Sequence, residues 1–209
     1  MMSKITFYTN PLSRARIARW MLEEVGADYE PRILTYNGTM KEPAYLAINP
    51  MGKVPAIVHD GNVVTECAAI CAYLADAFPE AGLAPPPAER ASYYRWLFFM
   101  AGPFEAAIIN KNFGFVVPAE RERSVGYGNF EHVMDTLDKL LSENRFVAGD
   151  NFTAADVYVG AQVGWGLQFG TIEKRDSFAA YAERIAARPA FIRASKLDDE
   201  AAAAEQAQT

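Results

Sequence analysis

The chain has 209 residues, enough for one large domain or two small ones, and its 51% hydrophobic and 22% charged content is that of a globular protein. This composition excludes disordered and collagen-like chains. Twenty Lys and Arg against 26 Asp and Glu give a formal charge of −6, and the basic residues do not cluster. Nucleic acids and anionic membrane surfaces are therefore not expected partners.

The cysteine and histidine content argues against cross-links and metal centres. Two cysteines cannot form a disulfide framework, and together with two histidines they make a poor set of metal ligands. The first ten residues lack the apolar core of a signal peptide, and no apolar run approaches the length of a membrane span. We expect a cytoplasmic protein that holds no metal and does not enter a membrane.

The first part of the chain alternates between strand and helix patterns. Residues 4–8 predict a strand, and residues 13–25 predict a helix, because apolar side chains recur there every three or four positions before Gly26. The next elements follow in the order strand, short helix, strand, strand and helix, over residues 29–34, 43–47, 54–58, 62–64 and 66–78. This order predicts a small mixed sheet of about four strands, with a parallel pair joined by the first helix.

The second part of the chain has only helical patterns. Residues 80–87 form a linker that ends in three prolines, which cannot continue a helix. Helices are predicted over residues 88–112, 118–144, 153–167, 178–187 and 190–196. Thr153 and Asp156 have the spacing of a capping box at the start of one of them. Residues 201–209 have no apolar face and are expected to fray.

Three segments carry a resemblance to a known family. They are Asn49-Pro-Met-Gly-Lys-Val-Pro-Ala-Ile57, Thr65-Glu-Cys-Ala-Ala-Ile-Cys-Ala-Tyr-Leu74 and Phe152-Thr-Ala-Ala-Asp156. In sequence, order and spacing they resemble the glutathione-binding segments and the helix-capping element of cytosolic glutathione S-transferases of the bacterial type. The resemblance implies an α/β domain followed by an all-α domain: a thioredoxin-like glutathione-binding domain at 1–79, a linker at 80–87 and a helical bundle at 88–209. It also implies a homodimer, a role in detoxification and glutathione as co-substrate.

The resemblance assigns glutathione-binding roles to several residues of the first domain. A cis peptide at Val54-Pro55 would turn the Val54 backbone outward, so that glutathione pairs with it as a short extra strand. The start of the helix at Glu66 and Cys67 would hold the γ-glutamyl carboxylate, and the Glu66 side chain its ammonium group. Cys67 departs from the family, which usually has serine there, and its weaker donor predicts looser binding.

Two lysines and one arginine near the same surface have alternative interpretations. Lys41 and Lys53 are candidates for the glycyl carboxylate of glutathione, although exposed lysines are commonly only solvated. Arg14 is able to help hold an anion at the start of the first helix, but a salt bridge to a surface carboxylate is an equal alternative.

The chemistry is expected between Tyr8 and Arg14. A free thiol has a pKa of about 8.5, and one donated hydrogen bond lowers it by roughly one to two units. Thr9, Asn10 and Ser13 are the candidate donors, in the order Asn10, Ser13, Thr9, because Asn10 aligns with the usual catalytic hydroxyl of the family. The segment contains no cysteine, which argues against disulfide exchange. Tyr8 belongs to the strand and is expected in the core.

An apolar electrophile is expected to bind on the helical half. The candidate pocket residues share large apolar side chains: Tyr93, Trp96, Met100, Phe104, Phe113 and Trp165. Aromatic residues at helical spacing usually form core, so only a few of them are expected to face a substrate.

The expected activity is the addition of glutathione to a hydrophobic electrophile. Two alternatives remain open from the sequence. One is a glutathione-binding scaffold without turnover, which the Asn10 and Cys67 replacements favour. The other is a glutathione-dependent peroxidase, isomerase or dehalogenase, since the same activated thiolate serves each reaction.

Overall fold

The computed structural model describes residues 4–207 and contains two compact units. The sheet-containing unit comprises the chain up to Leu83 together with the segment from Ala187 onward, and the helical unit comprises Ala84–Ala186. Within the described residues, no helix is both long enough and apolar enough to cross a bilayer. An α/β body and an all-helical body are the two parts of the fold class that the sequence predicts.

The sheet has the predicted mixed topology. Its strands are β1 (Ile5–Thr9), β2 (Tyr29–Ile33), β3 (Ala56–His59) and β4 (Asn62–Thr65), in the order β2-β1-β3-β4. β1 and β2 are parallel, whereas the other two pairs are antiparallel. β3 begins two residues later than predicted, because the ladder excludes Val54 and Pro55; proline has no N–H to donate to a strand.

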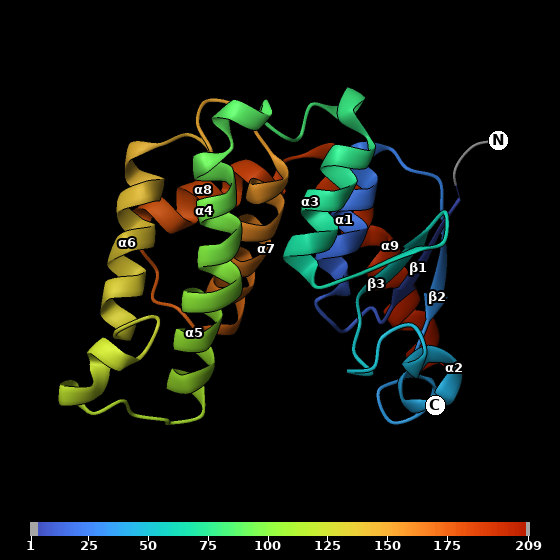
Figure 1. Cartoon of the computed structure of the whole chain (residues 1–209), viewed down its shortest axis with the longest axis horizontal. Helices are drawn as coiled ribbons and strands as arrows, with labels where there is room; N and C mark the ends of the chain where they lie inside the picture. Colours follow the sequence, from blue (N-terminus) through green and yellow to red (C-terminus); the bar gives the residue numbers. More distant parts are fainter. Residues whose placement is uncertain (1–3, 208–209) are drawn as a thin grey trace. The chain divides into compact units, whose positions relative to one another are not determined.

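Helices α1 (Ala15–Val25), α3 (Cys67–Ala77) and α9 (Pro189–Gln206) lie together beside the sheet, and the short α2 (Pro43–Leu46) follows a 3₁₀ turn at Thr39–Lys41 (Figure 1). α1 forms where predicted because Ile17 and Met21 bury one face of it, and Gly26 ends it in the left-handed conformation at φ 65°. Both α3 and α9 pack against α1.

The C-terminal helix is the main difference from the sequence-based division. Residues 190–196 predict a short helix in the helical half and residues 201–209 a frayed tail, but α9 is continuous from Pro189 to Gln206 and belongs to the sheet-containing unit. The prediction of fraying was wrong for residues 201–206, which are helical, because a run of alanines favours helix; residues 208–209 lie outside the described residues. Asp198, fully buried, pairs with Arg19 of α1 at 2.7 Å, and this contact fixes α9 on α1.

The helical unit contains α4 (Ala91–Phe99), α5 (Glu105–Asn112), α6 (Phe130–Glu143), α7 (Ala154–Phe169) and α8 (Asp176–Ala186) (Figure 1). The helix predicted over 88–112 is interrupted by a π-helical segment, Met100–Phe104, because Pro103 cannot donate a backbone hydrogen bond. The helix predicted over 118–144 is also wrong in its first half. A 3₁₀ segment at 119–124 comes first, and α6 begins only after Asn129, whose side chain accepts from His132 N at 2.9 Å.

Asp156 organises the start of α7. Its Oδ2 accepts hydrogen bonds from Thr153 N at 2.9 Å and Thr153 Oγ1 at 3.1 Å, so the predicted capping box is confirmed. Its Oδ1 accepts from Val147 N at 2.9 Å and from the Tyr181 hydroxyl of α8 at 2.8 Å. One buried carboxylate therefore joins the loop before α7, the helix start and α8.

We predict that Asp156→Asn destabilises the protein by about 3 kcal/mol, because an amide NH₂ group would face donors that now meet an oxygen. Urea unfolding followed by circular dichroism measures the change. Asp150→Asn is the matched control, since Asp150 is exposed in the same loop and its substitution should cost less than about 0.5 kcal/mol. Equal stabilities of the two variants would contradict the prediction.

Candidate functional site

Strand register brings the candidate residues of the sheet-containing unit to one edge of the sheet. Thr9, at the end of β1, pairs with Ile33 at the end of β2. Its neighbour Tyr8 pairs with Ala56 at the start of β3, and Ala56 pairs with Thr65 at the end of β4. Asn10, Leu34 and Glu66 directly follow these strand ends, and Pro55 directly precedes β3. Loop 10–14, the 53–55 turn and the start of α3 therefore meet at one edge of the sheet, which we call the site edge.

Asn10 is a clamp for loop 10–14. Its Nδ2 donates to Leu34 O at 2.9 Å, and its Oδ1 accepts from Leu12 N at 2.9 Å. Only 4% of Asn10 is exposed. The side chain therefore joins the ends of β1 and β2 and shapes the loop, a role that the sequence alone did not reveal for this first-ranked donor.

Ser13 caps α1. Its hydroxyl donates to Asn10 O at 2.7 Å and accepts from Ala15 N at 3.0 Å, and the residue is half-buried. A hydroxyl at this position lies where the positive end of the α1 dipole is strongest. Of the candidate donors, Ser13 is the one that retains a partly exposed surface.

Thr9 is fully buried, and its Oγ1 has no hydrogen-bond partner among the residues that the structure describes. A buried hydroxyl without a partner costs roughly 1–3 kcal/mol of stability. Tyr8, which is expected in the core, is half-buried and packs on Tyr45 with ring centroids 5.3 Å apart.

The turn before β3 contains the expected cis peptide between Val54 and Pro55. Two side chains that the sequence analysis did not single out hold this turn through the Lys53 carbonyl. Tyr45 donates to it at 2.6 Å and Asn49 at 2.8 Å. The signals in the sequence were an asparagine just before the proline turn and a tyrosine in the short helix that precedes it.

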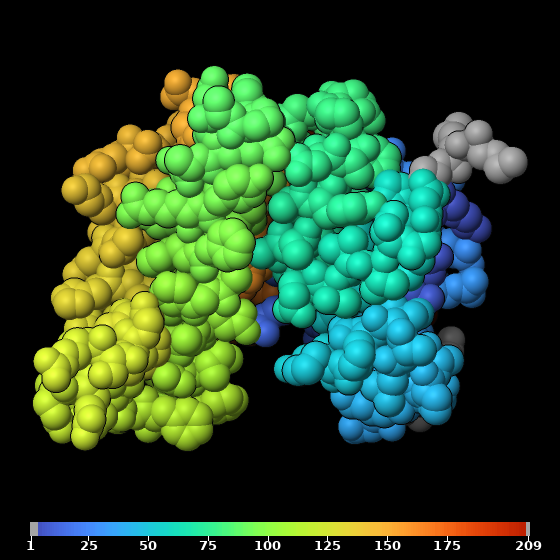
Figure 2. All heavy atoms as spheres, viewed as in Figure 1, coloured from blue at the N-terminus to red at the C-terminus, as the bar shows by residue number. Residues whose placement is uncertain are grey.

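The two candidate lysines differ in their surroundings. Both residues are exposed, but Lys41 donates to Gly52 O at 2.8 Å, so its ammonium group is held beside the turn. Much of residues 35–52, in light blue in Figure 2, lies on the surface of the sheet-containing unit, whereas Met40, Tyr45 and Asn49 are buried. Tyr36 ties this segment to the neighbouring loop by donating to Leu12 O at 2.9 Å.

The start of α3 has an unusual backbone. Glu66 is exposed and adopts φ 66° and ψ 124°, a region that non-glycine residues rarely occupy and that is common at binding sites. The Cys67 thiol donates to Arg14 O at 3.6 Å, which places the starts of α3 and α1 side by side. Cys71, one turn further along α3, is buried, and burial raises the pKa of its thiol.

The candidate pocket residues separate into two groups within the helical unit. Tyr93, Trp96, Met100 and Phe104 are each at most 4% exposed and form its core, so packing is the role that the structure shows for them. Phe113 is exposed and Trp165 is half-buried, and these two keep surface to offer a substrate. In residues 4–207, no three His, Cys, Asp or Glu side chains gather to hold a metal ion.

Burial of Tyr45 raises the pKa of its hydroxyl to about 12. In the unfolded chain the Tyr45 hydroxyl ionises near pH 10. The folded protein therefore gains stability from this tyrosine, in full below pH 10, and loses it as the pH rises through about 12. We predict that the wild-type protein loses about 1 kcal/mol more stability than Tyr45→Phe between pH 8 and pH 11. Urea titrations at both pH values measure this. Tyr36→Phe is the control, because it removes a surface hydrogen bond from a hydroxyl to a carbonyl and keeps Tyr45. If Tyr36→Phe loses only as much stability between pH 8 and pH 11 as Tyr45→Phe does, the assignment of the pH dependence to Tyr45 is refuted.

Thr9→Val should stabilise the protein by about 1 kcal/mol, because it removes a buried hydroxyl that has no partner in the described structure and keeps the side-chain shape. Thermal and urea unfolding measure the change. Thr6→Val, on the half-buried part of the same strand, controls for β-propensity. A destabilised Thr9→Val protein would show that the hydroxyl has a partner in solution.

Comparison with known proteins agrees with this geometry. Residues 13–77 match the family model of the glutathione S-transferase N-terminal domain. The chain is 31% identical to glutathione S-transferase 3 of Zea mays, over 91% of this chain and 92% of that protein.

Two solved structures extend the likeness over both units. A glutathione transferase of Methylococcus capsulatus is 30% identical with a TM-score of 0.76, and a sphingomonad glutathione S-transferase, solved in complex with glutathione, is 31% identical with a TM-score of 0.75. Each comparison covers 93% of this chain and 98% of the other. These similarities confirm the fold class, and the chain belongs to the glutathione S-transferase family.

Proposed function

We propose that the protein is a glutathione transferase that binds reduced glutathione at the site edge and adds its sulfur to a hydrophobic electrophile. The observation that carries this proposal is the meeting of the cis-proline turn, the exposed Glu66 and the first turn of α1 at one edge of the sheet. Family membership supports glutathione as the co-substrate.

Each part of the tripeptide finds a complementary group in this proposal. The Val54 backbone pairs with the extended peptide as an added strand. The start of α3 at Cys67 receives the γ-glutamyl carboxylate, with Glu66 on its ammonium group. Lys53 attracts the glycyl carboxylate, and Lys41 stabilises the turn through Gly52 O.

The sulfur is assigned to the first turn of α1. The thiol of glutathione releases its proton to water, and the Ser13 hydroxyl rotates from Asn10 O to donate to the resulting thiolate. The thiolate then forms a carbon–sulfur bond with the electrophile, which releases a leaving group or takes up a proton at the neighbouring carbon. We assign the donor role to Ser13 rather than Asn10, because Asn10 is only 4% exposed and its side chain joins Leu34 O to Leu12 N, whereas Ser13 is half-buried and keeps exposed surface.

The same observations favour one alternative, a glutathione-binding protein without turnover. Asn10, the first-ranked donor, is buried and its side chain joins Leu34 O to Leu12 N, and the single proton of Ser13 already has an acceptor at 2.7 Å. A purified protein that binds glutathione and leaves its thiol pKa near 8.5 would establish this alternative. A panel of aryl halides, hydroperoxides and isomerisable substrates separates conjugation from peroxidase and isomerase activity.

We predict that Ser13→Ala raises the pKa of the bound glutathione thiol by about one unit, since one charge-assisted hydrogen bond is lost. The rate of conjugation at pH 6.5 falls by about tenfold because the thiolate fraction falls by that factor. Absorbance near 240 nm across pH reports the thiolate, and calorimetry reports glutathione affinity.

Glu66→Gln is the matched variant, because it should weaken glutathione binding by about tenfold and leave the pKa of the bound thiol unchanged. A Ser13→Ala protein with an unchanged thiol pKa would remove Ser13 from the donor role. A wild-type protein that does not bind glutathione would refute the proposed function as a whole.

A further inference from the structure

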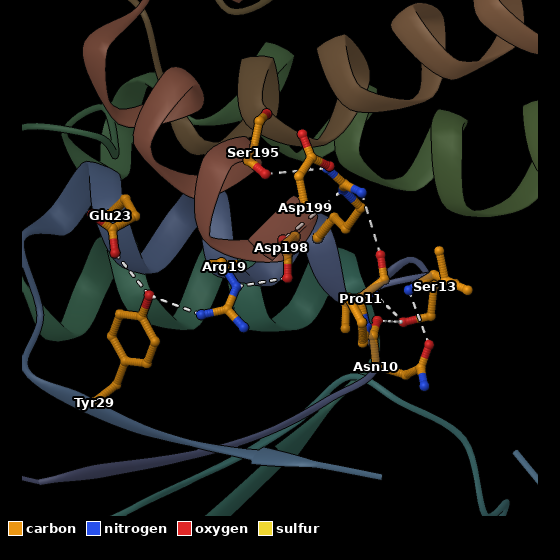
Figure 3. A network of polar contacts seen from close by, with 12 residues as sticks. Asn10, Pro11, Ser13, Arg19, Glu23, Tyr29, Ser195, Asp198 and Asp199 are labelled. Carbon is orange, nitrogen blue, oxygen red and sulfur yellow. Dashed lines mark hydrogen bonds and ion pairs between the residues drawn. The ribbon is translucent and has the colours of Figure 1, made fainter. Parts of the chain in front are cut away.

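Arg16 connects loop 10–14 to the C-terminal helix. It lies on the first turn of α1 and is half-buried. Its Nη1 donates to Pro11 O at 3.3 Å, and its Nη2 donates to Ser195 O at 3.3 Å and to Asp199 Oδ1 at 2.5 Å (Figure 3). One planar guanidinium therefore bridges the loop and α9, two segments far apart in the sequence.

The fully buried Asp198 strengthens the α9 side of this bridge. Its Oδ2 is 4.0 Å from Arg16 Nε, and its Oδ1 accepts from Arg19 Nε at 2.7 Å. Figure 3 shows the side chain of Asp198 beside that of Arg19, with the side chain of Asp199 next to it. Because Arg19 is itself bonded to Tyr29, which donates to Glu23, the position of α9 is fixed by a connected network rather than by one contact.

Other ion pairs between α1 and the segment of α9 with its preceding residue Arg188 differ from that of Arg16. Arg188 pairs with Glu24 at 2.7 Å, and Arg193 pairs with Glu23 at 3.1 Å. Both contacts are near the end of α1, at the opposite end from loop 10–14. Arg16 instead reaches the carbonyl of Pro11, between Asn10, which clamps the loop, and Ser13, which caps α1.

We propose that Arg16 is a positioning residue for glutathione activation, which uses α9 as a fixed support to hold loop 10–14 where Ser13 can donate to the thiolate. This inference rests on the proposed function. Arginine suits the role because its rigid fork can hold a carbonyl on one side and a carboxylate on the other, whereas the single ammonium of lysine cannot hold both with the same geometry.

The positive charge of Arg16 also lies near the thiolate end of the site, so an electrostatic effect has to be separated from positioning. The electrostatic effect and the positioning effect predict opposite changes in the pKa of the bound thiol for Asp199→Asn. Loss of a carboxylate that partly neutralises Arg16 would lower the thiol pKa by electrostatics alone. Loss of the support would release the loop and raise the thiol pKa. The Asp199 side chain is 68% exposed, so its substitution leaves the core intact.

The test measures the pKa of the bound glutathione thiol, together with kcat and KM for glutathione with 1-chloro-2,4-dinitrobenzene. We expect Arg16→Gln to raise the thiol pKa by about 0.5–1 unit and to lower kcat at pH 6.5 by about three- to tenfold, with KM for glutathione changed less than about twofold. Asp199→Asn should raise the pKa in the same direction, and Arg16→Lys should fall between Arg16→Gln and the wild type.

Arg193→Gln is the matched control, because it also removes an ion pair between α1 and α9 but one that does not reach the loop. It should lower the urea midpoint while leaving the thiol pKa unchanged. A pKa shift in Arg193→Gln equal to that in Arg16→Gln, an unchanged pKa in Arg16→Gln, or a lowered pKa in Asp199→Asn would each overturn the inference.

If Arg16→Gln does not fold, the sign of the shift in thiol pKa caused by Asp199→Asn decides. A wild-type protein that binds glutathione without lowering its thiol pKa overturns the proposed activation and this inference with it.

Discussion

β1 and β2 run in the same direction, so the chain must return along the sheet through α1 before β2 can begin. This places the start of α1 directly beyond the carboxyl end of β1, together with the end of β2. The antiparallel β3 and β4 then bring the turn before β3 and the start of α3 to the same edge. The location of the candidate site follows from strand direction, before any particular side chain is considered.

The polar groups at this edge are largely engaged with the protein itself. Asn10 and Tyr36 hold loop 10–14, and Tyr45 and Asn49 hold the cis-proline turn. Such preorganisation lets a ligand bind without first ordering the loops, which saves part of the entropy that binding would otherwise cost. It also means that several side chains at the site edge act by shaping the backbone, and that fewer side chains remain available to contact a ligand.

Local signals in the sequence were sufficient for most of the sheet-containing unit and for the start of α7 in the helical unit. Gly26 ends α1, the Asp60-Gly61 turn joins β3 and β4, and Thr153 with Asp156 starts α7, because each of these features depends on residues close together in the chain. The interruption at Met100–Phe104 was harder to predict, since the apolar pattern continues through it while Pro103 alters the backbone. The same local patterns could not separate core aromatics such as Trp96 from exposed ones such as Phe113, because exposure depends on how helices pack.

Contacts between distant residues could not be predicted in this way. Arg19 and Asp198 are 179 positions apart, and nothing near either residue indicates the other. The role of Asn10 was missed for a similar reason, because its partner Leu34 follows another strand, β2, and is 24 positions away. The resemblance to a family gave the candidate site residues, whereas the structure was needed to show that the Asn10 side chain holds the loop.

The position of α9 has a consequence for the synthesis of the chain. The sheet-containing unit is built from both ends of the sequence, with the helical unit inserted between them. During translation, residues 84–186 leave the ribosome before Asp198 exists to pair with Arg19, so the helical unit can fold first although it comes second in the sequence. Until residues 187–206 are released, α1 lacks the helix that covers it and Arg19 lacks its carboxylate. The nascent sheet-containing unit therefore completes its fold only after α9 has been made, and it is the part of the chain that most needs protection from aggregation in the meantime.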